Sequence, residues 1–312
     1  MNPSGKQALA GSAWAVCAIS IWAAWMVITR MDLLSSGLDE FDITAIRFAT
    51  ASLILSPVVA RQGIVAKSVG FGVTLLLAAC AGAPYVLIAS AGLTMAPASD
   101  AGPLTPGVMP LFAALLSAMF LKERIGRSRL FGLGLIPVGV ALVAGTSIAS
   151  GQPDRWIGDL LFMLAAFFWA VFTVTMRRGR VPSMHGAALV AAWSAVLYLP
   201  IYAFFLMRTP WHTGWATILQ QVIFQGVLTS VVSLVAFNKA IGILGASRSA
   251  VFASLVPALA TLLAVPLLHE QPTALQFIGI GVITLGVLFG SDAITLRLRR
   301  DPFSGSDQGE NA

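Results

Sequence analysis

Ten apolar stretches, each about long enough to cross a bilayer, occupy almost the whole chain of 312 residues. Read with a window of about 19 residues, they cover residues 8–29, 42–60, 69–94, 101–121, 128–147, 157–176, 185–206, 217–242, 246–268 and 273–291. A hydrocarbon core about 30 Å thick requires about 20 residues of helix. The connecting segments are too short for a separate aqueous domain. The sequence therefore predicts an all-α integral membrane protein with ten transmembrane helices.

The composition fits a membrane environment and excludes several classes of protein. Apolar residues make up 57% of the chain and charged residues 10%, against about 45–50% and 25% in soluble domains. This composition is atypical of a soluble enzyme, a disordered regulator or a secreted scaffold. The first stretch lacks the features of a cleaved signal peptide, so we expect a retained helix, and we expect a disordered tail at residues 301–312.

Lysine and arginine are distributed unequally between the two sides of the predicted bundle. If the N-terminus is cytoplasmic, fifteen of the nineteen basic residues fall on the cytoplasmic side. Arg30, Arg155 and Arg208 fall outside, and Arg47 lies within the second stretch. This bias follows the positive-inside rule. We therefore expect both termini in the cytoplasm and a location in a bacterial inner membrane, and the net charge of +6 requires no nucleic-acid partner.

An internal repeat is revealed when the second half of the chain is shifted over the first by 147 residues. At this one offset, tryptophan, proline, glutamate, arginine and glycine residues coincide. The matching pairs are Trp22 with Trp169, Pro110 with Pro257, Glu123 with Glu270, Arg30 with Arg177, and Gly132, Gly134 and Gly139 with Gly279, Gly281 and Gly286. Such coincidences are rare by chance, so duplication is the simplest explanation.

Each copy of the repeat contains five predicted spans, within residues 8–147 and residues 157–291. Because five is an odd number, the second copy must enter the membrane from the opposite face. The two copies are therefore expected to be inverted relative to each other. Inverted repeats are typical of secondary transporters, which bind their solute near the midplane between the halves.

Two similar segments end the fourth and ninth predicted spans. They are PLFAALLSAMFLKER (Pro110–Arg124) and PALATLLAVPLLHE (Pro257–Glu270), each followed by a glycine-rich helix, and Arg47 opens the run RFATASLIL. On these segments the chain resembles the drug/metabolite transporter superfamily, specifically its ten-span proteins with two EamA domains. The resemblance implies export of amino acids or other small metabolites through a central cavity. Aromatic-amino-acid exporters form one branch of that superfamily.

Aromatic and polar side chains share one face of the first and sixth predicted helices. Trp22 is followed by Met26 at i+4, and Trp169 by Thr173, so each helix presents a ring beside a thioether or a hydroxyl. Tyr85 lies inside the third span, where its hydroxyl needs a hydrogen-bond partner. Lining of a solute cavity and ordinary core packing both suit the tryptophan faces. For Tyr85, a substrate contact and an interhelical hydrogen bond are both open.

Polar residues of the eighth and ninth spans are candidate contacts for the polar ends of a solute. Lys239 follows Asn238 near the predicted cytoplasmic end, where it either holds a carboxylate or extends its ammonium to water. Ser254 is a further candidate. Pro110 and Pro257 lie within apolar spans, where each removes a helical N–H. They are expected to form either a pair of hinges or packed kinks.

Other charged residues are expected near the membrane surfaces. Arg47 lies about six residues inside the outer face and is expected to extend toward the acidic residues of segment 39–42. Glu123 and Glu270 end their helices beside basic residues, so loop ion pairs or helix caps are expected there.

These features predict a secondary transporter that exports small amphipathic metabolites, amino acids first, by alternating access. Nucleosides, sugars and other metabolite or drug classes are alternative substrates, and an intramembrane enzyme or a channel is disfavoured. The three histidines are scattered, no nucleophile turn is present, and the paired glycines suit helix packing better than a nucleotide loop. We therefore expect no cofactor and no metal, with a small-molecule substrate and the bilayer as partners. One chain already contains a two-fold path, which is compatible with a monomer.

Overall fold

The computed structural model describes residues 5–123, 125–207 and 213–290. The predicted tail at 301–312 and the C-terminus lie outside these residues. Every regular element of the described chain is helical. The elements are α1 (Gly5–Ser35), α2 (Glu40–Gln62), α3 (Gly70–Ala81), α4 (Ala83–Met95), α5 (Ala98–Leu104), α6 (Met109–Leu121), α7 (Arg127–Ala149), α8 (Arg155–Gly179), α9 (Ser183–Ile201), the π-helix η1 (Tyr202–Leu206), α10 (Trp215–Gln221), the π-helix η3 (Val222–Val232), α11 (Ser233–Leu244), α12 (Ala246–Ala253), α13 (Val256–Leu268) and α14 (Ala274–Gly290).

Each predicted apolar stretch coincides with one of these helices or with two or three consecutive ones. Within the described residues, nine helical segments are long and apolar enough to span a membrane. The tenth predicted stretch corresponds to α14, which has 17 residues. The chain is therefore a multi-pass helical membrane protein.

Besides the one-residue break at Gly82 between α3 and α4, two spans are interrupted at corresponding places in the two halves. A four-residue turn at 105–108 separates α5 from α6, and Ser254 and Leu255 separate α12 from α13. Pro110 and Pro257 occupy the first turn of α6 and α13. A proline in the first turn lacks only an N–H that has no helical partner. The prolines therefore begin helices after a break and do not kink a continuous one; their role as hinges stays a prediction.

The helices after these breaks also end alike. α6 and α13 have bounds that differ by 147 residues at both ends. Each ends at a residue in the left-handed conformation, Lys122 with φ 54° and His269 with φ 53°. A left-handed residue at this position terminates a helix and turns the chain sharply. The offset found in the sequence is thus reproduced in the backbone.

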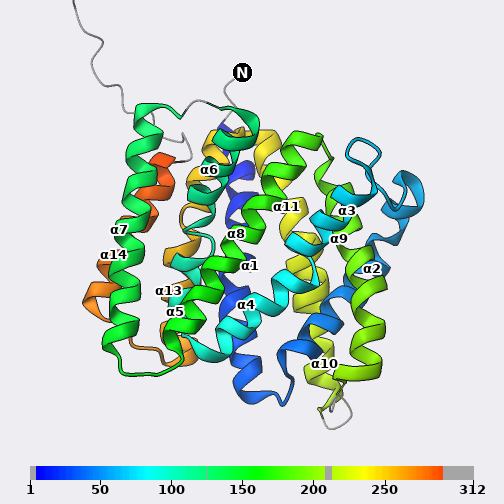
Figure 1. The fold of residues 1–312 in the computed structure, drawn as a ribbon, viewed down its shortest axis with the longest axis horizontal. Helices are drawn as coiled ribbons and strands as arrows, with labels where there is room; N and C mark the ends of the chain where they lie inside the picture. The colour runs from blue at the N-terminus through cyan, green and yellow to red at the C-terminus, as the bar shows by residue number, and fades with distance from the viewer. Residues whose placement is uncertain (1–4, 124, 208–212, 291–312) are drawn as a thin grey trace, which may run out of the picture.

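The packing of the helices follows the same correspondence. α1 packs against α11 and α13, while its counterpart α8 packs against α4 and α6. α7 and α14 lie side by side at one edge of the bundle, and α2 and α9 lie side by side at the other (Figure 1). Exchanging the two halves therefore converts the contacts of α1 into those of α8, and it converts the α7–α14 pair and the α2–α9 pair each into itself.

Glycines allow α7 and α14 to approach closely. The predicted role of the paired glycines in helix packing holds for Gly132 and Gly279 but not for Gly134 and Gly281. A Cβ on Gly132 would lie 2.4 Å from the backbone nitrogen of Gly290, and one on Gly139 would lie 2.7 Å from the carbonyl oxygen of Gly279. Gly134, by contrast, has no neighbouring atom within 4 Å of such a Cβ. Small residues at helix interfaces are a general device in membranes, where packing replaces the hydrophobic effect.

This contrast predicts different outcomes for two neighbouring glycines of α7. Gly132→Ala is expected to destabilise the protein by about 1–3 kcal/mol, because its methyl group meets backbone that has no room to move. Gly134→Ala is the matched control and is expected to be neutral or slightly stabilising, since it gains helix propensity alone. Thermal unfolding of the two purified variants measures the difference. Equal unfolding midpoints would contradict the described packing.

Candidate functional site

Two aromatic groups inside the bundle contain the predicted residues Trp22, Tyr85 and Trp169. In the first, the indole Nε1 of Trp22 on α1 donates to the hydroxyl of Ser233 on α11 at 3.1 Å. In the second, the ring centroids of Tyr85 on α4 and Trp169 on α8 lie 5.2 Å apart. The structure therefore brings Tyr85 and Trp169 together, and it places Trp22 against α11. The two tryptophans contact corresponding helices of opposite halves.

Both groups extend to neighbouring phenylalanines. The ring of Trp22 lies 4.8 Å from that of Phe237, and the ring of Trp169 lies 5.3 Å from that of Phe172. All four rings are partly buried, so each group is an apolar surface of limited exposure. Within the described residues, no ring contact joins Trp22 to Trp169.

Three other residues predicted to contact the solute are buried in the core or form hydrogen bonds with nearby backbone. Met26 is buried in the core. The hydroxyl of Thr173 donates to the carbonyl of Trp169 at 2.9 Å, and that of Ser254 donates to the carbonyl of Val251 at 2.7 Å. Both hydroxyls thus bond within their own helices, and a role in binding solute stays a prediction for all three residues.

Lys239 and Asn238 lie on α11. The side chain of Lys239 is exposed, and its Nζ lies 4.3 Å from the centroid of the Trp14 ring. An ammonium over an indole face gains about 0.5–1 kcal/mol at an exposed site. Asn238 is half-buried. Their contribution to binding stays a prediction as well.

Arg47 does not reach the acidic residues at the start of α2, and that prediction is wrong. Asp39 caps α2 by accepting from the backbone N–H groups of Phe41 and Asp42, and Asp42 accepts from the N–H of Asp39 in return. The capping box therefore occupies these carboxylates. The guanidinium carbon of Arg47 instead lies 5.5 Å from the centroid of the Trp25 ring, inside the bundle.

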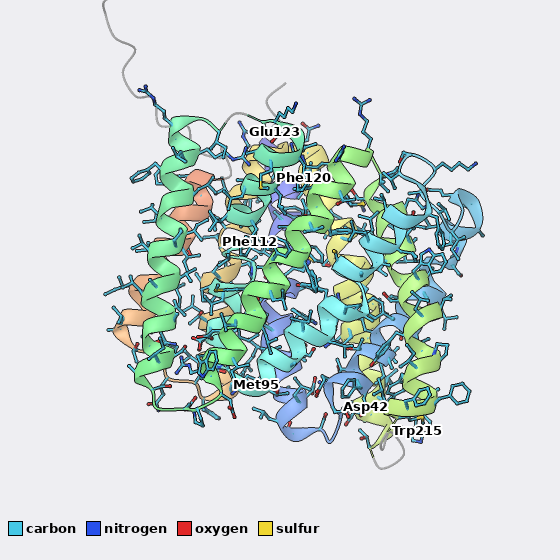
Figure 2. All side chains as sticks on the ribbon, in the orientation of Figure 1. Asp42, Met95, Phe112, Phe120, Glu123 and Trp215 are labelled. Atoms are coloured by element: carbon cyan, nitrogen blue, oxygen red, sulfur yellow. The ribbon has the colours of Figure 1, made fainter. Side chains whose placement is uncertain are left out.

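The two ends of the bundle carry the remaining charged contacts. We call the end that holds the start of α1 and Glu123 the N-terminal end, and the end that holds Asp42 and Met95 the distal end (Figures 1 and 2). At the distal end, the carboxylate of Glu270 accepts from the N–H groups of Ala98 and Ser99 at 2.8 and 2.9 Å. Glu270 thus caps the start of α5.

Arg30 completes this cluster. Its Nε lies 3.2 Å from Oε1 of Glu270, and its Nη1 donates to the carbonyls of Leu93 and Ala96. The expected ion pair and cap at Glu270 are therefore confirmed, but the basic partner comes from α1 and not from the adjacent loop. The side chains of Arg30 and Glu270 are only 17% and 11% exposed.

A second ion pair lies beside the first. Nε and Nη2 of Arg155 each lie 2.8 Å from Oδ2 of Asp100, whose other oxygen accepts from Nε2 of Gln276 at 2.8 Å. Asp100 is fully buried. A cavity of about 270 Å³ adjoins both pairs; it is lined by Arg30, Pro97, Ser99, Gln152, Arg155, Glu270, Gln271, Pro272 and Gln276. This cluster ties α1, α5, α8 and α14 together at the distal end.

The counterpart of the Arg30–Glu270 pair lies at the N-terminal end. There, Nη2 of Arg177 lies 2.6 Å from Oε1 of Glu123. Arg177 and Glu123 are the residues that the 147-residue offset matches to Arg30 and Glu270. These side chains are 52% and 33% exposed, so the pair meets far more water than its counterpart. The 147-residue offset in the sequence matches these four residues with one another, but it does not predict that arginine and glutamate pair across the two halves.

Comparisons with known proteins agree with this architecture. Residues 9–145 and residues 156–291 each match the EamA-like transporter family. The chain belongs to this family. The family description is that of transporters, and the two matched segments coincide closely with the two halves of the helical bundle.

Several individual proteins are similar to this family member. A probable terminal-alkyne amino-acid exporter of Streptantibioticus cattleyicolor is 23% identical over 90% of this chain and 93% of its own. A probable amino-acid metabolite efflux pump of Escherichia coli is 30% identical over 56% of this chain and 62% of its own. The chain spans 60% of the length of YetK, an uncharacterized transporter of Bacillus subtilis, at 26% identity. A crystal structure with 20% sequence identity matches 90% of this chain and 96% of its own with a TM-score of 0.59, which supports the fold.

The two arginine–glutamate pairs are expected to contribute unequally to stability. Arg30→Met leaves Glu270 with little water and no cation, a loss on the order of 3 kcal/mol. Arg177→Met breaks an exposed pair and is expected to cost about 1 kcal/mol or less. Thermal unfolding of the purified proteins compares these repeat-related variants. A larger loss for Arg177→Met would contradict the burial described for the distal end.

Proposed function

We propose that this EamA-like transporter is a secondary carrier that exports small amphipathic metabolites, amino acids first, by alternating access. In this proposal ten spans form two inverted repeats around a central path in a bacterial inner membrane. Both termini face the cytoplasm, as the distribution of basic residues favours. The N-terminal end is then the cytoplasmic end of the bundle, and the distal end is the outer one.

The observation that carries this proposal is that each of the two arginine–glutamate pairs joins one half of the chain to the other. Arg30 of the first half pairs with Glu270 of the second, and Arg177 of the second half pairs with Glu123 of the first. One pair lies at each end of the bundle. In an inverted duplication, when the two halves exchange conformations, the closed end of the bundle opens and the open end closes. A buried pair at one end and a hydrated pair at the other suit a carrier with its distal end closed.

The interrupted spans support motion of the same elements. The breaks before α6 and α13 leave backbone without a continuous helix, which membrane proteins tolerate where it is buried or lines an aqueous cavity. Glu270 both pairs with Arg30 and caps α5 at the distal end. If Glu270 moves away from Arg30 and α5, the short helix α5, which lies next to a break, loses its cap and is free to move. Such a joint permits rearrangement without unfolding a whole span.

The substrate class follows from two independent indications. Two relatives carry names that describe an amino-acid exporter and an amino-acid metabolite efflux pump. The aromatic groups around Trp22 and Trp169 supply apolar surfaces of the kind that bind the body of a small ligand. Amino acids with apolar or aromatic side chains are therefore the first candidates.

Transport assays in proteoliposomes test the proposed function directly. Uptake of labelled phenylalanine and related amino acids is expected to saturate and to be stimulated by unlabelled solute on the opposite side. Trp169→Ala is expected to lower uptake, because it removes a ring that contacts Tyr85. Linear uptake without trans-stimulation would indicate a pore, and absence of uptake for all amino acids would contradict the proposed substrate class.

Alternating access predicts opposite effects of the two repeat-related glutamates. A cysteine replacing Ser99, which lines the distal cavity and is buried, reports opening of that end to a membrane-impermeant thiol reagent. In a background without Cys17 and Cys80, Glu270→Gln is expected to accelerate labelling and Glu123→Gln to slow it. A change of labelling rate in the same direction in both variants would contradict alternation between a state closed at the distal end and a state closed at the N-terminal end.

A further inference from the structure

Arg47 is a half-buried cation that has no ion-pair partner among the described residues. Its Nε and Nη1 atoms are inaccessible to water and have no hydrogen-bond partner in the described part of the chain. The guanidinium lies 5.5 Å from the centroid of the Trp25 ring and 5.9 Å from that of Phe48. Arg47 is the eighth residue of α2, so it lies about 10 Å along the helix from its start at 1.5 Å per residue. Its charge is therefore well inside the bundle.

The carboxylates at the end of α1 and the start of α2 do not pair with Arg47, and Glu40 at the start of α2 forms no ion pair with it among the described residues. Asp39 and Asp42 form the capping box of α2, and Asp42 also accepts from the hydroxyl of Tyr202. Asp32 near the end of α1 accepts from the amide of Gln221. No ion pair to Arg47 is found among the described residues.

The helices packed against α2 supply no anion either. They are α4, α9, α10, η1 and η3, and none of them contains an aspartate or a glutamate. The one titratable group they add besides tyrosines is His185 of α9, which bonds the carbonyl of Gly63 at the other end of α2. The environment of Arg47 thus contains aromatic rings, amides and hydroxyls, but no opposite charge.

A guanidinium in such a place is expensive and therefore points to a ligand. Burying an unpaired charge costs several kcal/mol, and stacking on aromatic faces returns about 2 kcal/mol or more when the cation is desolvated, which offsets part of that cost. Ionisable residues within membrane spans are accordingly functional candidates by default. The missing interaction is with an anion, and a planar guanidinium suits a carboxylate because it donates two parallel hydrogen bonds.

The surroundings of Arg47 indicate what the rest of this anion looks like. Tyr85 lies on α4, which packs against α2, and it belongs to the same buried cluster as Trp25 and Phe48; its ring contacts Trp169. Trp25 is fixed by donating its indole N–H to Oε1 of Gln225 at 2.9 Å, and Gln225 in turn donates to the hydroxyl of Thr29 at 2.9 Å. The guanidinium thus lies close to the Trp25 and Phe48 rings, and the Tyr85–Trp169 pair belongs to the same aromatic surroundings.

We propose that Arg47 binds the carboxylate of the solute and that the Tyr85–Trp169 group holds its apolar body. The ligand class is a small monocarboxylate with an apolar or aromatic side chain, which includes the α-amino acids. The inference rests on the proposed function for its claim that the ligand is transported. The claim that the carboxylate is bound at Arg47 stands on the contacts above.

A pair of probes that differ only in charge tests the site. Binding of 3-phenylpropionate and of 3-phenylpropanamide to the purified protein in detergent is measured by titration calorimetry. The acid is expected to bind at least tenfold more tightly than the amide, because only the acid supplies the missing anion. Equal affinities, or no binding of the acid, would overturn the proposal.

Three variants locate the effect at Arg47. Arg47→Gln is expected to weaken the acid about 10- to 100-fold and to leave the amide unchanged. Arg47→Lys is expected to retain part of the preference for the acid, since it keeps the charge without the planar fork. Arg61→Gln is the matched control, because Arg61 lies on the same helix and is exposed. Loss of the preference in Arg61→Gln, or its retention in Arg47→Gln, would contradict the assignment.

Thermal unfolding separates a binding role from a structural one. Without ligand, Arg47→Gln is expected to unfold at the same temperature as the parent or higher, since the variant no longer buries an unpaired charge. A midpoint lowered by several degrees would show that Arg47 supports the fold instead. With 3-phenylpropionate, only proteins that keep Arg47 are expected to gain stability.

The binding measurements and the transport assay can contradict the two proposals separately. Acid binding through Arg47 without transport in proteoliposomes would overturn the proposed function alone. Saturable transport of phenylalanine that Arg47→Gln leaves unchanged would overturn this inference alone.

Discussion

In a span surrounded by hydrocarbon and other helices, a charge needs a partner at hand, and this requirement organises the polar interactions of the protein. Arg155 donates a hydrogen bond to each carboxylate oxygen of Asp100, and Gln276 donates a further one to Oδ1. Glu270 obtains one cation and two backbone N–H groups. Each of these contacts joins helices distant in sequence. The few charges inside the bundle therefore determine which helices meet at its distal end.

Much of the architecture could be predicted from the sequence, because membrane spans leave a strong one-dimensional signal. The apolar stretches and the 147-residue offset both follow from residue identity alone, and the helix bounds reproduce them. The glycine interface was predictable in part. Gly132 and Gly139 face α14, whereas Gly134 faces open space. Which glycine faces a partner depends on the rotation of the helix, and periodicity gives that rotation only approximately.

The site was harder to predict, because side-chain partners depend on three-dimensional direction. Arg47 lies five residues after Asp42, so proximity along the chain favoured an ion pair. In the structure the carboxylate turns back to cap its own helix, and the arginine turns inward to Trp25. For Glu270, the sequence offered basic neighbours in the loop, yet its partner lies on α1. Repeat matching of Arg30 with Arg177 and Glu123 with Glu270 was the available signal for this pairing.

The cluster of Asp100, Arg155 and Gln276 has no equivalent in the other half, where the offset places Ser247, Ala8 and Arg129. In the proposed carrier, duplication would supply the scaffold for two conformations related by exchange of the halves, but it would not make them equal in energy. For a carrier that alternates, the empty protein would rest mostly with this reinforced side sealed. Solute arriving from the two compartments would then meet different kinetic barriers, although the net direction of flow would still be set by the gradients alone.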